Sequence, residues 1–168
     1  AVLTGGGSDE ARFVVESLRL PRTLIGVAVG MALGVAGSLI QAVARNPLAE
    51  PGLLGVSAGS ALAVAIALVL GASAATLRIS VAQLGALAGC LFVLAMARVN
   101  GVGNDPVRLV LAGAILSGLL GALTSLLLLV DQRSADEIRF WVIGSLAGRR
   151  LEDLRAILPS LLFAGMLI

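Results

Sequence analysis

Long apolar runs without a single charged residue alternate with short polar segments along this 168-residue chain. About 20 apolar residues span the roughly 30 Å hydrocarbon core of a bilayer, so a run of that length can cross a membrane once as a helix. Four runs are long enough, and four complete spans are therefore expected. These charge-free runs cover residues 23–44, 53–77, 79–97 and 109–130.

The same pattern predicts an all-α fold, a polytopic transmembrane helical bundle in which the whole chain is part of one membrane domain. A fifth apolar run, residues 156–168, is too short to cross by itself. Position 1 is not Met and the first residues read as a loop, so we expect the chain to be an excerpt of a longer protein. The expected spans lie at about 23–44, 53–72, 79–98 and 107–130, followed by an incomplete one at 154–168.

A polar hinge, defined here as residues 45–59, separates the first two apolar runs and contains two prolines. Proline restricts its own backbone and that of the preceding residue. Asn46-Pro47 and Glu50-Pro51 are therefore each expected to stop a helix or to open one. The hinge predicts a tight reversal between two membrane-length helices.

Small residues recur at intervals of four along each span. Such stripes let helix backbones approach closely, and in lipid this close packing replaces the hydrophobic drive that water supplies elsewhere. Helix–helix packing is the expected role, and a pathway lining or a subunit contact is the alternative. The stripes consist of Gly26, Gly30, Gly34 and Ser38, then Gly55, Gly59 and Ala63, then Gly85 and Gly89, and finally Gly113, Ser117, Gly121 and Ser125.

The segment before the first span and the loop before the fourth carry helix-start signals. Residues 1–17 are expected to form a loop and a short surface helix. Pro21 suits the first turn of the first span, where its missing N–H would be unpaired in any case. Asp105 before Pro106 gives a good N-cap for the fourth span, after a turn at Asn100-Gly101.

A second surface helix is expected at residues 135–147. Ser134 and Glu137 have the spacing of a capping box at its start. Ile138, Trp141 and Val142 fall on one face of this helix, which predicts an amphipathic element with its tryptophan at the membrane interface. Further on, Pro159 predicts a kink in the last apolar run.

Composition agrees with a membrane protein and excludes some partners. The chain is 58% hydrophobic and 13% charged, far from the balance of a soluble domain. Its net charge of +2 comes from arginine alone, and no basic patch with interleaved aromatic residues points to nucleic acid. The lone Cys90 is expected to be a small packing residue in the third span.

The residue types that catalysis needs are missing from the sequence. There is no His or Tyr, and no carboxylate lies inside an apolar run, so neither a general acid–base pair nor a metal cluster can be assembled. No phosphate-binding G-x-x-x-x-G-K-[ST] motif occurs, which argues against ATP hydrolysis. The spans also lack the buried ionisable groups of an ion-coupled carrier. If this protein transports something, its energy source is expected on another chain.

Several motifs resemble those of the FecCD-type permeases, the membrane subunits of bacterial ABC importers for iron–siderophores, haem and cobalamin. The most specific match is the contiguous stretch from Asn46 to Gly59. Gln41 and three further motifs match in the same order: Arg19-Leu20-Pro21-Arg22-Thr23-Leu24, Arg108-Leu109-Val110-Leu111-Ala112-Gly113 and Trp141-Val142-Ile143-Gly144-Ser145-Leu146.

The resemblance implies a non-enzymatic transporter subunit without a cofactor, a ten-helix permease in the bacterial cytoplasmic (inner) membrane. Such a permease works as a homodimer or beside a related permease, with ATP-binding cassette subunits and an extracytoplasmic substrate-binding protein as partners. This chain would hold the second to fifth helices and part of the sixth. A ferric siderophore is the expected cargo, with haem and cobalamin as alternatives.

The resemblance also assigns roles to individual residues. Arg19 and Arg22 match arginines that bind acidic residues of the binding protein, a role that suits the planar guanidinium; from the local sequence alone, snorkelling to lipid headgroups is the simpler interpretation. Asn46 and Leu48 match positions that narrow the cytoplasmic end of the pathway. The fourth span matches a helix that lines the pathway, with Gly113, Ser117 and Gly121 on it. Pro106-Val107 stands where some relatives have small hydroxyl residues, so a polar inner gate is not expected there.

Arginine counts bear on the orientation of the chain in the membrane. Nine arginines lie on the side of residues 1–22, 72–78 and 131–155, against three on the other side. The positive-inside rule would place the nine in the cytoplasm, whereas the resemblance places them outside. We expect them outside, because an outer surface that docks an acidic partner explains the excess. A purely structural membrane scaffold would explain the glycine stripes but not the hinge or the paired arginines.

Overall fold

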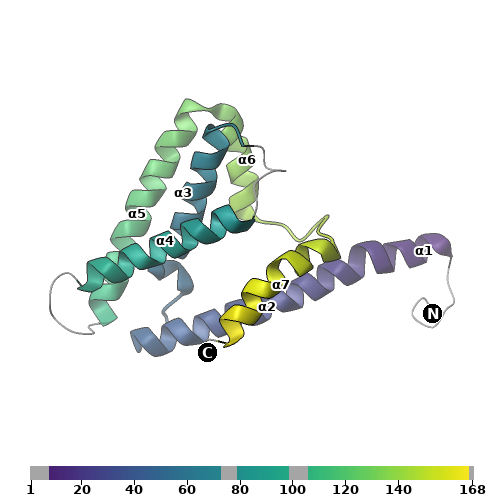
Figure 1. The fold of residues 1–168 in the computed structure, drawn as a ribbon, viewed down its shortest axis with the longest axis horizontal. Coiled ribbons are helices and arrows are strands. Elements are labelled where there is room, and N and C mark those ends of the chain that lie inside the picture. Colours follow the sequence, from purple (N-terminus) through teal and green to yellow (C-terminus); the bar gives the residue numbers. More distant parts are fainter. Residues whose placement is uncertain (1–7, 73–78, 99–105, 167–168) are drawn as a thin grey trace. The chain divides into compact units, whose positions relative to one another are not determined.

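A computed structural model describes residues 8–72, 79–98 and 106–166 (Figure 1). Within these ranges the regular structure is helical and no strand is present, so the predicted all-α fold is confirmed. The chain divides into two compact units, which are described separately. Unit 1 comprises Ala1–Val35 and Ser145–Ile168, and unit 2 comprises Ala36–Gly144.

Unit 1 begins with a helix that changes type twice without a break. The α-helix α1 (Asp9–Phe13) runs into a π-helical segment, η2 (Val14–Arg19), and then into α2 (Leu20–Ala44), which continues into unit 2. The Ser8 hydroxyl accepts a hydrogen bond from the Ala11 N–H at 3.3 Å and caps the start. The short surface helix expected before residue 17 is therefore the first part of a 36-residue helix.

Pro21 is the second residue of α2, in its first turn as expected, but the helix is continuous with η2 before it. In a regular α-helix the proline ring would collide with the carbonyl of Ser17, four residues earlier. Just before Pro21, the Leu20 N–H instead bonds the Val15 carbonyl, five residues back. This wider π turn is how a proline can be accommodated without ending the helix.

The other helix of unit 1 is α7 (Leu151–Met166). Its start is fixed by the Asp153 carboxylate, which accepts a hydrogen bond from the Arg150 backbone N–H at 2.9 Å. Glu152 and Asp153 both stand in the first turn, where the helix dipole favours negative charge. Pro159 lies inside α7, as expected, and the kink at this residue stays a prediction.

Unit 2 is built around α3 (Val56–Val69), which packs against α4 (Ile79–Arg98) through glycine. A Cβ added at Gly59 would collide with the Gly85 carbonyl, and one added at Gly89 would collide with the Gly55 carbonyl. The Ser60 hydroxyl also donates to the Ala82 carbonyl across this contact at 2.9 Å. Close packing through small residues is thus confirmed for the second and third stripes.

The first stripe behaves differently. A Cβ added at Gly30 or Gly34 would meet nothing within 4 Å in the described chain. At Gly26 the nearest such atom is a side-chain carbon of Leu146, at 3.5 Å, which is an ordinary contact. Helix packing by the first stripe stays a prediction.

The remaining helices of unit 2 are α5 (Pro106–Val130) and α6 (Gln132–Ile143), and both pack on α3. Ile138 of α6 is 2% exposed and joins Val64, Ala65 and Leu68 of α3 in one buried cluster. Leu127 of α5 packs against this cluster. The segment expected to lie on the membrane surface is therefore folded back onto the bundle.

One detail predicted for α6 is wrong, and another stays a prediction. The helix begins at Gln132, so Ser134 lies within it and not at the N-cap position that a capping box requires. Trp141 and Val142, expected on the same face as Ile138, are 39% and 61% exposed, and the position of Trp141 at the membrane interface stays a prediction. The described neighbours cover only the first two turns of α6, where Ala135 and Ile138 are buried.

Three helices in the described ranges are long and apolar enough to cross a membrane: Asp9–Ala44, Ile79–Arg98 and Val107–Val130. The expected second span contains α3, whose 14 residues give a length of only about 21 Å. It is short because Gly55, at φ 71°, separates it from the 3-10 turn η3 (Pro51–Leu54). The helix α3 is thus shorter than the second span expected at residues 53–72, whose bounds stay a prediction. The turn and N-cap expected at Asn100-Gly101 and Asp105 lie outside the described residues.

Candidate functional site

The hinge begins where α2 ends, and the predicted helix break is confirmed there. Arg45 adopts a left-handed conformation with φ 48°, unusual for a residue with a side chain. Its N–H bonds the Ala42 carbonyl, and the Asn46 N–H bonds the Gln41 carbonyl. This pair of bonds is the Schellman arrangement, which satisfies carbonyls left open at the end of the helix.

Asn46 and Leu48, the residues predicted at the cytoplasmic gate, lie together in the next turn. The Asn46 side-chain oxygen accepts a hydrogen bond from the Leu48 N–H at 2.9 Å, and the Asn46 carbonyl accepts one from Ala49. Ala49 is 4% exposed and packs with Ile40 and Ala44 of α2. Leu48 is 86% exposed. The turn is thus anchored by a buried alanine and presents a leucine away from the described chain.

The second half of the hinge is clamped between helices. A Cβ added at Gly55 would lie 3.2 Å from a methyl group of Val93 and 3.3 Å from one of Leu116. Glycine is therefore favoured at position 55 by its positive φ, and the two methyl groups would have to shift to admit a side chain. Two residues earlier in the chain, Leu53 lies with its carbonyl directly against the backbone of Gly113 on α5. The hinge and α5 are in backbone contact at this point.

The residues predicted to line the pathway occupy three different environments along α5. Gly113 is buried against Leu53. The Ser117 hydroxyl is buried and has no hydrogen-bond partner in the described chain. A Cβ added at Gly121 would meet nothing within 4 Å there. The structure thus leaves Gly121 open to a neighbour and shows a packing role for Gly113.

Arg19 and Arg22 both lie in unit 1, at the junction of η2 and α2, and both are exposed. Among the described residues neither guanidinium takes part in an ion pair. The nearby Arg12, by contrast, lies 3.6 Å from the Glu16 carboxylate. The two arginines are available to an external group of opposite charge.

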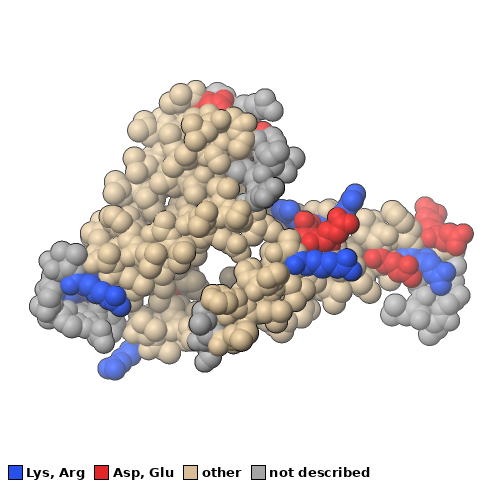
Figure 2. All heavy atoms as spheres, in the orientation of Figure 1, with Lys and Arg blue, Asp and Glu red and all other residues tan. Residues whose placement is uncertain are grey.

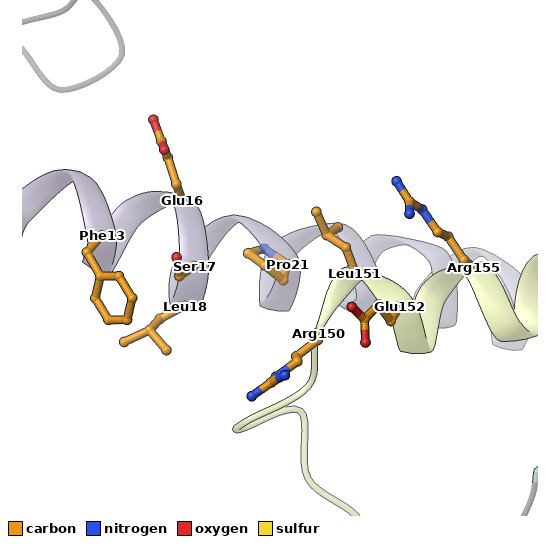
Figure 3. Close-up of a pocket in the computed structure, with 9 residues that line it drawn as sticks. All are labelled: Phe13, Glu16, Ser17, Leu18, Pro21, Arg150, Leu151, Glu152 and Arg155. Atoms are coloured by element: carbon orange, nitrogen blue, oxygen red, sulfur yellow. The ribbon is translucent and has the colours of Figure 1, made fainter.

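A cavity of about 500 Å³ lies in the same unit, between η2 and the start of α7 (Figure 3). Its wall includes the apolar side chains Phe13, Leu18, Pro21 and Leu151. Charged side chains complete the lining: Glu16, Arg150, Glu152 and Arg155, together with Ser17. Figure 2 shows charges of both signs gathered over this part of unit 1, on the face in view. The cavity combines an apolar wall with a charged rim.

No motif in the sequence indicates this cavity. Its two sides are more than 120 positions apart along the chain, so no local pattern connects them. One signal was present: Phe13 and Leu18 are large apolar residues in a segment too charged to enter the bilayer. Apolar residues that gather outside the bilayer are candidates for contact with another protein surface.

The residues of the hinge, of α5 and around the cavity are suited to binding and packing. No group of three or more His, Cys, Asp or Glu residues that could hold a metal ion occurs in the ranges searched, 8–72, 79–98 and 106–166. Cys90 is half-buried in α4 and has no disulfide partner. The hinge and the α5 face lie in unit 2, whereas the arginines and the cavity lie in unit 1.

Comparison with known proteins agrees with this description. The chain matches the FecCD transport family over residues 1–168. It is 44% identical to the ferric enterobactin transport system permease protein FepD of Escherichia coli K12, over 90% of this chain and 46% of that protein. It is 35% identical to the cobalamin import system permease protein BtuC of Halobacterium salinarum, over 95% of this chain and 43% of that protein.

A solved structure is also similar. A metal-chelate type ABC transporter in an inward-facing conformation aligns with a TM-score of 0.81 at 30% identity, covering 98% of this chain and 52% of that one. The chain spans about half the length of the curated relatives it matches. The resemblance seen in the hinge and arginine motifs is confirmed: the chain belongs to the FecCD transport family and is part of a multi-pass membrane protein.

Proposed function

We propose that the whole protein is the permease subunit of a binding-protein-dependent ABC importer that carries an iron–siderophore complex across the bacterial inner membrane. The observation that carries the proposal is the family match over residues 1–168. The relatives named for ferric enterobactin and Fe(3+)-citrate transport favour iron cargo, with haem and cobalamin as alternatives. ATP hydrolysis belongs to partner ATP-binding cassette subunits in this proposal.

The proposal gives the hinge a mechanical task at the cytoplasmic mouth of the pathway. Leu48 protrudes almost fully exposed from a turn that Ala49 anchors. Two copies of such a leucine, one from each permease of a dimer, can close an opening by apolar contact. Asn46 holds the turn in shape through its bond to the Leu48 N–H. Movement of the anchoring helices then opens or closes the mouth.

The pathway itself is proposed along the α5 stripe. Gly121 lacks a described neighbour on its open side, and the Ser117 hydroxyl can serve a passing polar group if α5 shifts. Gly113 contributes by fixing η3 to the wall of the pathway. Small side chains leave room for a large complex and give few specific contacts, so cargo selection falls mainly to the binding protein.

Docking of the binding protein is proposed at Arg19 and Arg22. Guanidinium groups form strong, often two-bonded pairs with carboxylates, and these two have no ion-pair partner in the described chain. The same proposal places the arginine-rich side outside. Maleimide labelling of single cysteines at Ser134 and Asn104 tests this: access from outside at position 104 but not 134 would reverse the orientation.

Uptake of radiolabelled ferric siderophore tests the function directly. Cells that lack the gene should lose uptake, and the intact gene should restore it. The double variant Arg19→Glu, Arg22→Glu should abolish docking of the purified binding protein to the permease–ATPase complex, while the control Arg139→Gln, which breaks only an exposed pair with Asp136, should not. Unchanged uptake in the deletion strain would leave a structural scaffold as the better interpretation.

A further inference from the structure

The cavity between η2 and α7 extends along the helix to a part that the bilayer does not reach. The charge-free segment 23–44 has a length of about 33 Å at 1.5 Å per residue, which fills the hydrocarbon core. Leu18 then stands about 8 Å beyond the core, and Phe13 about 15 Å. The headgroup layer is only about 5–8 Å deep on each side. Lipid therefore cannot cover Phe13.

Both apolar side chains are nevertheless open. Phe13 is 61% exposed and Leu18 is 52% exposed. Figure 3 shows them extending to one side of the helix, the side towards which Arg150 also extends, while Glu16 extends to the other. Large apolar side chains that share a cavity with charged groups are typical of a protein interface with an apolar centre and a polar rim.

The charges on the rim are not equally available. Glu16 is occupied by Arg12, at 3.6 Å. The guanidinium groups of Arg150 and Arg155 have no ion pair among the described residues, and Arg150 uses its backbone N–H, not its side chain, to cap α7. The rim therefore offers two cations to a partner and retains one unpaired carboxylate, that of Glu152. This favours an acidic partner.

We infer that the cavity is a socket for an apolar side chain of the extracytoplasmic binding protein, flanked there by carboxylates that pair with Arg150 and Arg155. The inference rests on the proposed function and extends its docking surface. Pro21 lines the cavity and stands between Arg19 and Arg22 in the chain, so the socket and the two arginines belong to the same stretch of helix. Glu152 repels an acidic residue placed in the wrong register and so contributes specificity.

Binding of the purified binding protein to the full permease–ATPase complex in nanodiscs tests the socket. Phe13→Ala and Leu18→Ala should each raise the Kd about tenfold, because buried aromatic and aliphatic anchors dominate interface energy. Arg150→Glu should raise the Kd and weaken its dependence on salt. Glu152→Gln should lower the Kd by a few-fold. The matched control Phe140→Ala, an exposed phenylalanine on α6, should leave the Kd unchanged.

A higher Kd for Arg150→Glu together with a lower Kd for Glu152→Gln would indicate recognition of an acidic partner, because a general loss of structure would raise the Kd in both variants. If the socket variants bind normally while Arg19→Glu with Arg22→Glu abolishes docking, the socket is overturned and the proposed function stands. If that double variant also binds normally, the docking part of the proposed function fails as well.

The other possible occupants are separate outcomes of a second measurement. A fluorescent label is placed at Leu18→Cys in a Cys90→Ala background. A blue shift of its emission on adding the binding protein supports the socket. Quenching by brominated lipids would show that lipid fills the cavity, and a disulfide between two Cys-substituted copies at position 18 would show a second permease. Either result overturns the inference.

Discussion

The backbone contact between Gly113 and Leu53 leads to a sharp prediction for Gly113→Ala. The added methyl group would lie well inside contact distance of the Leu53 carbonyl, and the atom it meets is backbone and cannot rotate away. Overpacking of this kind costs about 1–3 kcal/mol, and the upper end applies here. Replacing glycine by alanine inside a helix returns up to about 1 kcal/mol. The expected net loss of stability is therefore about 2 kcal/mol.

Gly121→Ala is the matched control, since it lies two turns further along α5. An added Cβ there meets nothing within 4 Å in the described chain. Its thermal midpoint in detergent should equal or slightly exceed that of the unaltered protein, whereas Gly113→Ala should fall by several degrees. If Gly121 lines the pathway, its alanine variant should still reduce siderophore uptake at equal protein level.

Two results would contradict the described packing of α5. Gly113→Ala with an unchanged thermal midpoint would show that η3 does not rest on α5 as described. A Gly121→Ala protein as unstable as Gly113→Ala would show that the open side of α5 is packed in the whole protein. Differential scanning fluorimetry on purified variants separates these cases without reference to transport.

Three further substitutions test other parts of the fold. Arg45→Gly should stabilise the protein by about 1 kcal/mol, because glycine tolerates the observed φ of 48°; an unchanged or lower thermal midpoint would mean that the arginine side chain holds the hinge in another way. Ile138→Ala should lower the free energy of unfolding by about 2–5 kcal/mol and expose α6 to proteolysis. Ile143→Ala, at an 81% exposed position, should do neither, and equal effects of the two substitutions would contradict the packing of α6 on the bundle. Ser60→Ala should cost only about 0.6 kcal/mol, measured by unfolding in mixed micelles, and a much larger loss would mean that this bond organises the α3–α4 contact.

Much of the helix pattern could be predicted because it depends on local chemistry. Charge-free runs mark the spans, and the two prolines of the hinge mark the break after Ala44. The glycine spacing also predicted the tight α3–α4 contact, since only glycine lets backbones come so close. These features can be predicted without knowing which segments are in contact.

The features that were predicted wrongly or missed depend on contacts with other parts of the chain. A proline usually marks the beginning of a helix, because its ring collides with a preceding α-helical turn. At Pro21 the preceding turn is the π turn of η2, so the helix continues through this residue without a break. The start of α6 was placed at Ser134 by a capping pattern, whereas packing on α3 and α5 favours a start at Gln132. The cavity could not be predicted because residues near 18 and near 151 meet only in the folded chain.

The contacts of the hinge connect the proposed gate at Leu48 with the proposed pathway along α5. Ala49, which anchors the turn carrying Leu48, packs in the same buried cluster as Leu53. Leu53 in turn touches Gly113 on α5, and Gly55 is held between Val93 of α4 and Leu116 of α5. Because packed interiors respond to displacement as rigid bodies more than as fluids, a shift of α5 must displace the turn that carries Leu48. A helix that lines the pathway and a residue that closes its mouth would then move together, and no separate linkage between them is required.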